Sequence, residues 1–443
     1  MGTIACVDVG STFTKAAAVD ADRGALLATA SHPTTVGSDV MVGVAAVLAE
    51  VAAAAVDVDE VRACSSAGGG LRLAVVGQER VVTAEAGRRV GLSAGARVVH
   101  VGAGMLDPAG LAELAASRPD VVLLCGGTDG GDEEVLRHNA ARLAVKGPRV
   151  PYVVAGNVEA RDDVVAALRA RRRTAIPTAN VLPRIGVLDP MPARLAIREV
   201  FIAHVIGGKG LSKGPAFGRL VRGATPDLVL AGVELLADGA GEVPGAGDVL
   251  VVDVGGATTD VYSALAPAGE DAEGRREVVA ELPVARTVEA DLGVRWSADG
   301  VLDAAAREGL AVSAGLPRYA AHVATDPAHL PTDEIERTLD LELARLAALV
   351  AVRRHARPAQ PGESGRDLRD VTLALGSGGV LRHGPRRDAE AVLRAVASDD
   401  AGGWRTPRAA QTRLDAAYPL VVVGLLAETH PDAARRLAPR LLD

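Results

Sequence analysis

Two stretches of the sequence repeat one arrangement of aspartate, glycine and hydroxyl residues. The first spans residues 4–15 and carries Asp8, Gly10, Ser11, Thr12, Thr14 and Lys15. The second spans residues 250–261 and carries Asp253, Gly255, Gly256, Thr258 and Thr259. In both, an apolar run ends in the aspartate, and a glycine-rich turn leads into a second run. This pattern predicts two β-hairpins whose tips face a phosphate.

The turn residues suit a ligand that is rich in oxygen atoms. Gly10, Gly255 and Gly256 have no Cβ and tolerate positive φ, so backbone N–H groups can approach phosphate oxygens directly. Further donors come from neighbouring hydroxyl groups, those of Ser11, Thr12, Thr258 and Thr259, and Thr14 is also expected to bind the nucleotide. We therefore expect both tips to present donors to one ligand.

The charged residues of the two stretches indicate a metal ion as well. Asp8 and Asp253 would repel phosphate unless a divalent cation lay between them, and Mg²⁺ is commonly held by one or two carboxylates with several retained waters. Lys15, on the outgoing strand of the first hairpin, can place its charge on the terminal phosphates. These residues predict a site for Mg²⁺ and a nucleotide.

Two ordinary hairpins with glycine turns are the alternative, because short glycine motifs match by chance. Two copies about 245 residues apart make this less probable. A third segment, residues 371–381, reads as a strand, a glycine-rich turn and a helix, and it contains Gly376, Ser377, Gly378 and Gly379. Bare backbone there would let an adenine or ribose lie flat, although this segment alone is weak evidence.

The order of these three segments resembles the actin, heat-shock chaperone and sugar-kinase superfamily of ATPases, and the resemblance spans most of the chain. It implies an α/β protein with two actin-like (ribonuclease H-like) lobes. It also implies that Asp8 and Asp253 hold Mg²⁺ through water, that Lys15 touches the β and γ phosphates, and that Asp253 orients the attacking water. The implied phosphate cradle is Gly255, Gly256, Thr258 and Thr259, and the implied adenosine border is Gly376, Gly378 and Gly379.

Within that superfamily the sequence resembles the accessory protein of the adenosylcobalamin-dependent glutamate (methylaspartate) mutase. The motifs that carry this resemblance lie at residues 7–15, 124–131, 155–158, 208–212 and 253–260. By similarity to diol dehydratase reactivating factors, it implies a chaperone-like protein that couples ATP use to release of damaged cobalamin from a mutase. A small-molecule kinase on the same fold and a nucleotide-binding scaffold without turnover remain alternatives.

Bulk properties exclude several other classes of function. The 443 residues carry a net charge of −8 and only 2% aromatic residues, which disfavours nucleic-acid binding. Three widely spaced cysteines and scattered histidines form no metal-ligand motif, which disfavours a protein-bound zinc ion. The sequence shows neither a signal peptide nor an apolar run long enough to span a bilayer, so we expect a cytoplasmic protein.

The order of elements predicts four parts. Residues 1–95 form the first lobe, 96–188 an inserted doubly wound α/β domain, 189–245 the rest of the first lobe and a linker, and 246–443 the second lobe. The insertion is predicted from apolar strands at residues 97–101, 120–125 and 150–155 that alternate with helices, a pattern typical of a parallel sheet.

Several further features allow two interpretations. Thr128, Asp129 and Asn157 follow strands of the inserted domain, where they could form a second recognition site or simply begin helices. The carboxylates of Glu289 and Asp291 could face the cleft between the two lobes, or they could take part in interactions that stabilise the fold. Gly424, in an apolar helix that returns to the first lobe, could allow close helix packing at a hinge. The acidic segment 268–276 reads as an exposed loop.

Overall fold

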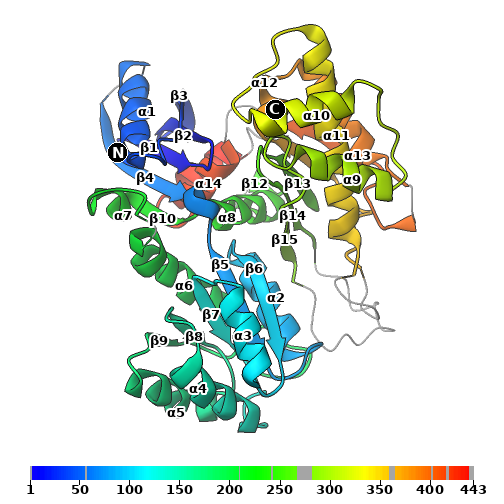
Figure 1. Ribbon diagram of the computed structural model, residues 1–443. Helices are drawn as coiled ribbons and strands as arrows, with labels where there is room; N and C mark the ends of the chain where they lie inside the picture. The colour runs from blue at the N-terminus through cyan, green and yellow to red at the C-terminus, as the bar shows by residue number, and fades with distance from the viewer. Residues whose placement is uncertain are drawn as a thin grey trace.

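The computed structural model describes residues 2–54, 57–208, 210–240, 243–266, 282–358, 365–400, 403–415 and 419–438. The acidic segment 268–276 lies outside these residues. Three sheets of five strands form three units, which Figure 1 shows as two upper lobes and a lower domain. None of the helices in the described ranges is long and apolar enough to cross a membrane.

The first lobe is built on a mixed sheet in the order β3-β2-β1-β4-β10. Its strands are β1 (Thr3–Val9), β2 (Phe13–Asp20), β3 (Ala25–Pro33), β4 (Val58–Ser65) and β10 (Val221–Ala224). The first three form an antiparallel meander, whereas β4 and β10 run parallel to β1. Helix α1 (Val40–Ala54) covers one face and α7 (Ala216–Leu220) packs beside β4. Every residue of β1 is buried, which explains its continuous apolar run.

The second lobe repeats this arrangement in the order β15-β14-β13-β16-β17. Its strands are β13 (Val249–Val254), β14 (Thr259–Ala264), β15 (Val284–Glu289), β16 (Leu373–Ser377) and β17 (Gln411–Leu414). Within the described residues, its helices are α9 (Ala298–Arg307), α10 (Leu316–Thr325), α11 (Glu334–Ala356), α12 (Gly379–His383) and α13 (Arg386–Ala397). The matching strand orders confirm the prediction of two lobes of one actin-like fold.

The third sheet is entirely parallel, in the order β6-β5-β7-β8-β9. Its strands are β5 (Arg72–Gly77), β6 (Arg97–Ala103), β7 (Val121–Leu124), β8 (Tyr152–Val154) and β9 (Ala175–Pro177). Around it lie α2 (Thr83–Ser93), α3 (Pro108–Ala116), α4 (Glu134–Lys146) and α5 (Val158–Ala170). This is the doubly wound insertion that the sequence predicts.

The inserted sheet begins earlier in the chain than residue 96. Strand β5, which lies between β6 and β7 in the sheet, comes before residue 96, and it was not predicted from the sequence. Leu73 and Val75 pack into one core while Ala74 and Val76 pack into another, so both faces of β5 are buried. A strand covered on both faces lacks the alternation of polar and apolar residues that marks a half-exposed strand.

Two helices cross between the lobes: α8 (Thr225–Asp238) and α14 (Pro419–Ala427). The chain reaches α8 through α6 (Met191–Val200) and a π-helical stretch, Phe201–Ile206, and continues from it into the short hairpin β11 (Gly239–Ala240) and β12 (Val243–Pro244). After α14, the chain ends in α15 (Pro431–Leu437). Glycines allow the close crossing, since a Cβ on Gly424 would lie 1.8 Å from the Leu228 oxygen and one on Gly232 would lie 2.4 Å from the Leu420 oxygen. The expected close packing at Gly424 is therefore confirmed.

Candidate functional site

The tips of the two predicted hairpins have the same geometry. The Gly10 N–H donates to the Phe13 carbonyl at 3.0 Å, and the Gly255 N–H donates to the Thr258 carbonyl at 2.9 Å. A Cβ on Gly10 would lie 2.7 Å from the Phe13 oxygen, and one on Gly255 would lie 2.8 Å from the Thr258 oxygen. Neither these glycines nor Gly256 has positive φ. Glycine is therefore needed at positions 10 and 255 because a carbonyl oxygen approaches closely, and not because the backbone has positive φ.

The two tips face each other. A Cβ on Gly256 would lie only 3.9 Å from the hydroxyl oxygen of Thr12. The side chains of Ser11 and Thr12 are exposed, and Gly256 and Thr258 are half-buried. Residues from the two lobes, more than two hundred positions apart in the chain, therefore meet at one place.

Each tip is supported from behind by a neighbouring segment. At the first tip, the Thr34 hydroxyl donates to the Gly10 carbonyl at 2.9 Å and the Thr34 N–H donates to the Thr12 carbonyl at 2.8 Å. At the second tip, the Arg295 N–H donates to the Gly256 carbonyl at 2.9 Å. Arg295 is itself fixed by a buried, two-pronged ion pair with Asp340, at 2.6 and 3.0 Å. The tips are thus held in place before any ligand arrives.

Two of the predicted ligand residues support the hairpins instead. Thr14 is fully buried with its hydroxyl 3.1 Å from that of Thr34, and the fully buried Thr259 hydroxyl donates to the Leu292 carbonyl at 2.6 Å. Alternation along each strand turns Thr14 to the face opposite Lys15, and Thr259 to the face opposite Asp260. The expectations that Thr259 offers its hydroxyl at the tip and that Thr14 binds the nucleotide are corrected accordingly.

Asp8 sits near the end of β1 with partners from two neighbouring strands and from the start of α8. It lies opposite Lys15 on β2 and beside Cys64 on β4. Its Oδ1 accepts a hydrogen bond from the Thr225 hydroxyl at 2.6 Å, and the Cys64 thiol donates to the same oxygen at 3.4 Å. The buried Asp8 carboxylate is thus oriented by two neutral donors.

Charges from both lobes converge around Asp253. Burial raises the pKa of Asp253 to about 6, helped by Asp260 and Asp415 and opposed by Lys15 and Arg382. The pKa of Lys15 is lowered by burial, while Asp8 and Asp253 act in the opposite direction. An aspartate with such a pKa near neutrality is suited to accept a proton. Lys15 of the first lobe and Asp253 of the second therefore share one electrostatic environment.

The third predicted segment packs directly behind Asp253. Gly378 has φ of 107°, and a Cβ there would lie 2.1 Å from the Val254 carbonyl oxygen, so only glycine fits. At Gly376 a Cβ would meet Leu393 at 2.8 Å, whereas Gly379, at the start of α12, has nothing within 4 Å. Ser377 is buried and donates to Asp415 at 3.3 Å. Its hydroxyl is engaged within the lobe.

Four site residues escaped the sequence analysis, namely Cys64, Thr225, Arg382 and Asp415. Because the two lobes have the same strand order, three of these residues occupy positions that have an equivalent in the other lobe. Cys64 pairs with Asp8 in the register of β1 and β4, as Ser377 pairs with Asp253 in that of β13 and β16. Thr225 follows β10, as Asp415 follows β17. Aligning the two halves of the sequence strand by strand would have found these residues.

The carboxylates fit a hydrated magnesium ion better than a fully protein-bound metal. Within the described residues, no group of three or more His, Cys, Asp or Glu side chains could hold a metal ion. Asp8 and Asp253 come from facing hairpins, and Mg²⁺ readily keeps most of its waters. The donor set therefore suits an ion held by two carboxylates through water.

The other polar features of the sequence are satisfied within the fold. The Asn157 side chain accepts from the Glu159 N–H at 3.0 Å, and Asp129 accepts from the Val158 N–H at 3.1 Å, so both cap α5. Arg354 binds Glu289 and Asp291 at 2.7 Å each. The helix-cap interpretation thus accounts for Asn157 and Asp129, and an ion pair accounts for the two carboxylates.

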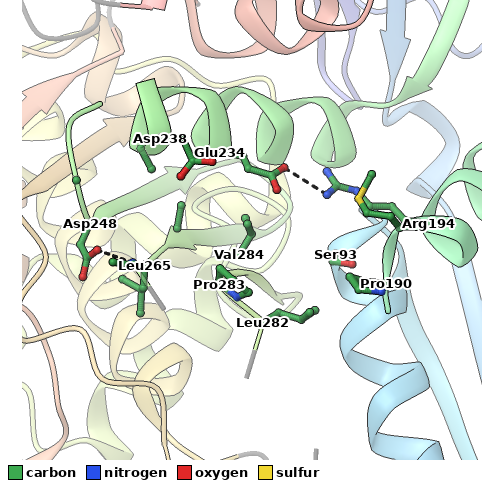
Figure 2. A pocket seen from close by; sticks show the side chains of 15 residues that line it. Ser93, Pro190, Arg194, Glu234, Asp238, Asp248, Leu265, Leu282, Pro283 and Val284 are labelled. Carbon is green, nitrogen blue, oxygen red and sulfur yellow. Dashed lines mark hydrogen bonds and ion pairs between the residues drawn. The ribbon is translucent and has the colours of Figure 1, made fainter. Parts of the chain in front are cut away.

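A cavity of about 350 Å³ lies where the three units meet, between α8, the start of α6 and the ends of β14 and β15. Figure 2 shows Glu234 and Arg194 facing each other across its upper edge, 3.4 Å apart. The apolar wall includes Leu265, Leu282 and Val284. None of the predicted site residues lines this cavity.

Residues 4–442 match the model of the family described as MutL protein. The chain belongs to the MutL protein family. This MutL-family chain is 35% identical over 460 residues to Protein MutL of Clostridium tetanomorphum, covering 98% of each chain. Nucleotide-free acetone carboxylase has a similar structure, with TM-score 0.42, 14% identity and coverage of 96% of this chain and 70% of the other. Glycerol dehydratase reactivase has TM-score 0.34, 13% identity and coverage of 96% and 99%.

Proposed function

We propose that this MutL-family chain binds Mg-ATP between its two hairpin tips and hydrolyses it slowly, as a chaperone-like accessory protein of an adenosylcobalamin-dependent mutase. The observation that carries the ATP site is the approach of Thr12 to Gly256, because it brings two phosphate-type turns from different lobes together. The charges of Asp8 and Asp253 both act on Lys15, which supports one shared site for these three side chains.

The roles proposed for the chain's own residues follow from their surroundings. Backbone N–H groups and hydroxyls at the tips would bind the phosphates, and Lys15 would offset their charge. Asp8 and Asp253 would hold hydrated Mg²⁺, which neutralises phosphate charge when bound. Asp253, with its raised pKa of about 6, would accept a proton from the attacking water.

Closure of the lobes would link the ATP site to a partner. A ligand drives such a movement only if it binds one state better than another, and a triphosphate held by both tips favours the closed state. The α8–α14 crossing is the contact about which the lobes would turn. Membership of the MutL family and the central motifs at residues 124–131, 155–158 and 208–212 support a mutase of the glutamate mutase type as partner.

The test is reactivation of a glutamate mutase inactivated with damaged cobalamin. We expect recovery of mutase activity with this protein, Mg²⁺ and ATP, and no recovery with Asp8→Ala or Asp253→Ala. Sustained recovery with a non-hydrolysable ATP analogue alone would contradict the role of hydrolysis. ADP formation that a small metabolite accelerates many-fold would instead support a kinase, and intact ATP after hours with the mutase would support a scaffold.

A further inference from the structure

The two lobes are built alike around their aspartates, but they differ at the residue that follows the fifth strand. In the first lobe this residue is Thr225, whose hydroxyl binds Asp8. In the second lobe it is Asp415, a buried carboxylate that cannot donate a hydrogen bond when ionised. The second lobe therefore has an additional negative charge where the first has a neutral donor.

A cation from α12 accompanies that additional charge. The Nε and Nη2 atoms of Arg382 donate to the main-chain carbonyl of Asp415 at 3.2 and 3.1 Å, and Nη2 lies 3.8 Å from its Oδ2. Ser377 donates to the same carboxylate at 3.3 Å. Only 9% of the Arg382 side chain is exposed, so this guanidinium is not an ordinary surface group.

Arg382 also belongs to the electrostatic environment of the cleft. The carboxylates of Asp415, Asp253 and Asp8 all act on it, and its own charge acts on Lys15. Because Lys15 lies on the first lobe and Arg382 on the second, each lobe contributes one cation to this group of interacting charges. A guanidinium can bind phosphate oxygens through two parallel hydrogen bonds, whereas an ammonium acts as a point charge.

We propose that Arg382 is a second phosphate-binding cation of the cleft, held in position by Asp415 and Ser377, so that the polyphosphate is gripped by one cation from each lobe. This inference rests on the proposed ATP site and adds a residue to it. A purely structural Arg382, which only ties α12 to the segment after β17, is the competing explanation.

The test measures Mg-ATP, Mg-ADP and adenosine binding by calorimetry for the wild type, Arg382→Gln, Arg382→Lys and, as a matched control, Arg386→Gln, whose side chain is 77% exposed. For Arg382→Gln we expect ATP affinity to fall by about tenfold to a hundredfold. Adenosine affinity should be unchanged because adenosine carries no phosphate, whereas the thermal midpoint without nucleotide should fall, because the buried Asp415 loses its neighbouring cation. Arg382→Lys should recover part of the loss, and Arg386→Gln should bind like the wild type.

Different results separate the two proposals. If the wild type binds no Mg-ATP, the proposed function fails. If the wild type binds Mg-ATP and Arg382→Gln binds it equally well, only the role of Arg382 is overturned. An equal loss of ATP and adenosine affinity in Arg382→Gln would assign Arg382 the structural role.

Discussion

The hydroxyl oxygen of Thr12 lies 3.9 Å from the position that a Cβ on Gly256 would occupy. The first residue belongs to the β1–β2 turn and the second to the β13–β14 turn. Their contact joins the two lobes at the point where both predicted phosphate hairpins end. If phosphates bind there, this contact must open or adjust to admit them.

Cysteines at these two positions should report on the ligand. With Thr12→Cys and Gly256→Cys together, we expect a disulfide to form under mild oxidation, since a sulfur in place of the Thr12 hydroxyl would start 3.9 Å from the Cβ at position 256, a small movement away from disulfide geometry. Mg-ATP should slow the reaction by lying between the tips. Gel mobility after oxidation measures it, and the single variants serve as controls because Cys6, Cys64 and Cys125 are buried. Absence of cross-linking without nucleotide would contradict the tip contact.

Because α8 and α14 cross closely, adding one methyl group at position 424 should destabilise the protein. Gly424→Ala would place a Cβ 1.8 Å from the Leu228 oxygen, so α14 and α8 must separate. We expect the first unfolding transition to lose about 1–3 kcal/mol in urea, as for other overpacked cores. Gly218→Ala is the control, since nothing lies within 4 Å of a Cβ there. Equal stability of the two variants would show that the helices do not cross so closely.

His355 should make the second lobe sensitive to acid. Arg366 donates to the Ser263 oxygen at 2.6 Å, and this hydroxyl lies 2.7 Å from His355 Nε2, where it can donate its proton to a neutral ring. Burial lowers the pKa of His355 from 6.5 to about 3. The resulting stability is fully present above about pH 6.5 and is lost as pH falls toward 3, by about 2 kcal/mol between pH 6.5 and 5.

Urea unfolding at several pH values tests this expectation. His355→Gln should show a shallower loss of stability below about pH 6.5 than the wild type, whatever its stability at neutral pH. The exposed His204→Gln should follow the wild-type curve. Parallel curves for His355→Gln and the wild type would mean that this histidine is not held neutral.

The interaction between Arg295 and Asp340, which supports the second tip, should behave as a buried ion pair. Removing one partner, as in Arg295→Met or Asp340→Leu, leaves a buried charge and should cost about 3–5 kcal/mol of unfolding free energy. The double variant should be more stable than either single variant. Arg386→Met, which breaks an exposed pair with Glu390, should cost far less, because water already solvates both charges. Additive losses in the double variant would argue against the pair.

Local patterns predicted both hairpins, the alternating strands of the insertion and the helix with Gly424, because each depends on residues close together in the chain. β5 was missed because it is buried on both faces. Thr14 and Thr259 were placed among the ligand residues because their type suits phosphate, yet strand alternation turns them inward. Arg382 and Asp415 were missed because parallel strand pairing brings distant residues together, and no local motif marks such a meeting.

Calorimetric titration with Mg-ATP tests the central claim most directly, using one variant in each hairpin. A side chain in Gly10→Val or Gly255→Val would collide with the carbonyl across its own turn, at 2.7 or 2.8 Å. We predict a single site in the wild type and a loss of at least about tenfold in affinity in each variant, since both tips bind the same triphosphate. Gly37→Val, with open space around its Cβ, should bind normally. Full ATP affinity in either Gly10→Val or Gly255→Val would contradict a triphosphate shared between the two tips.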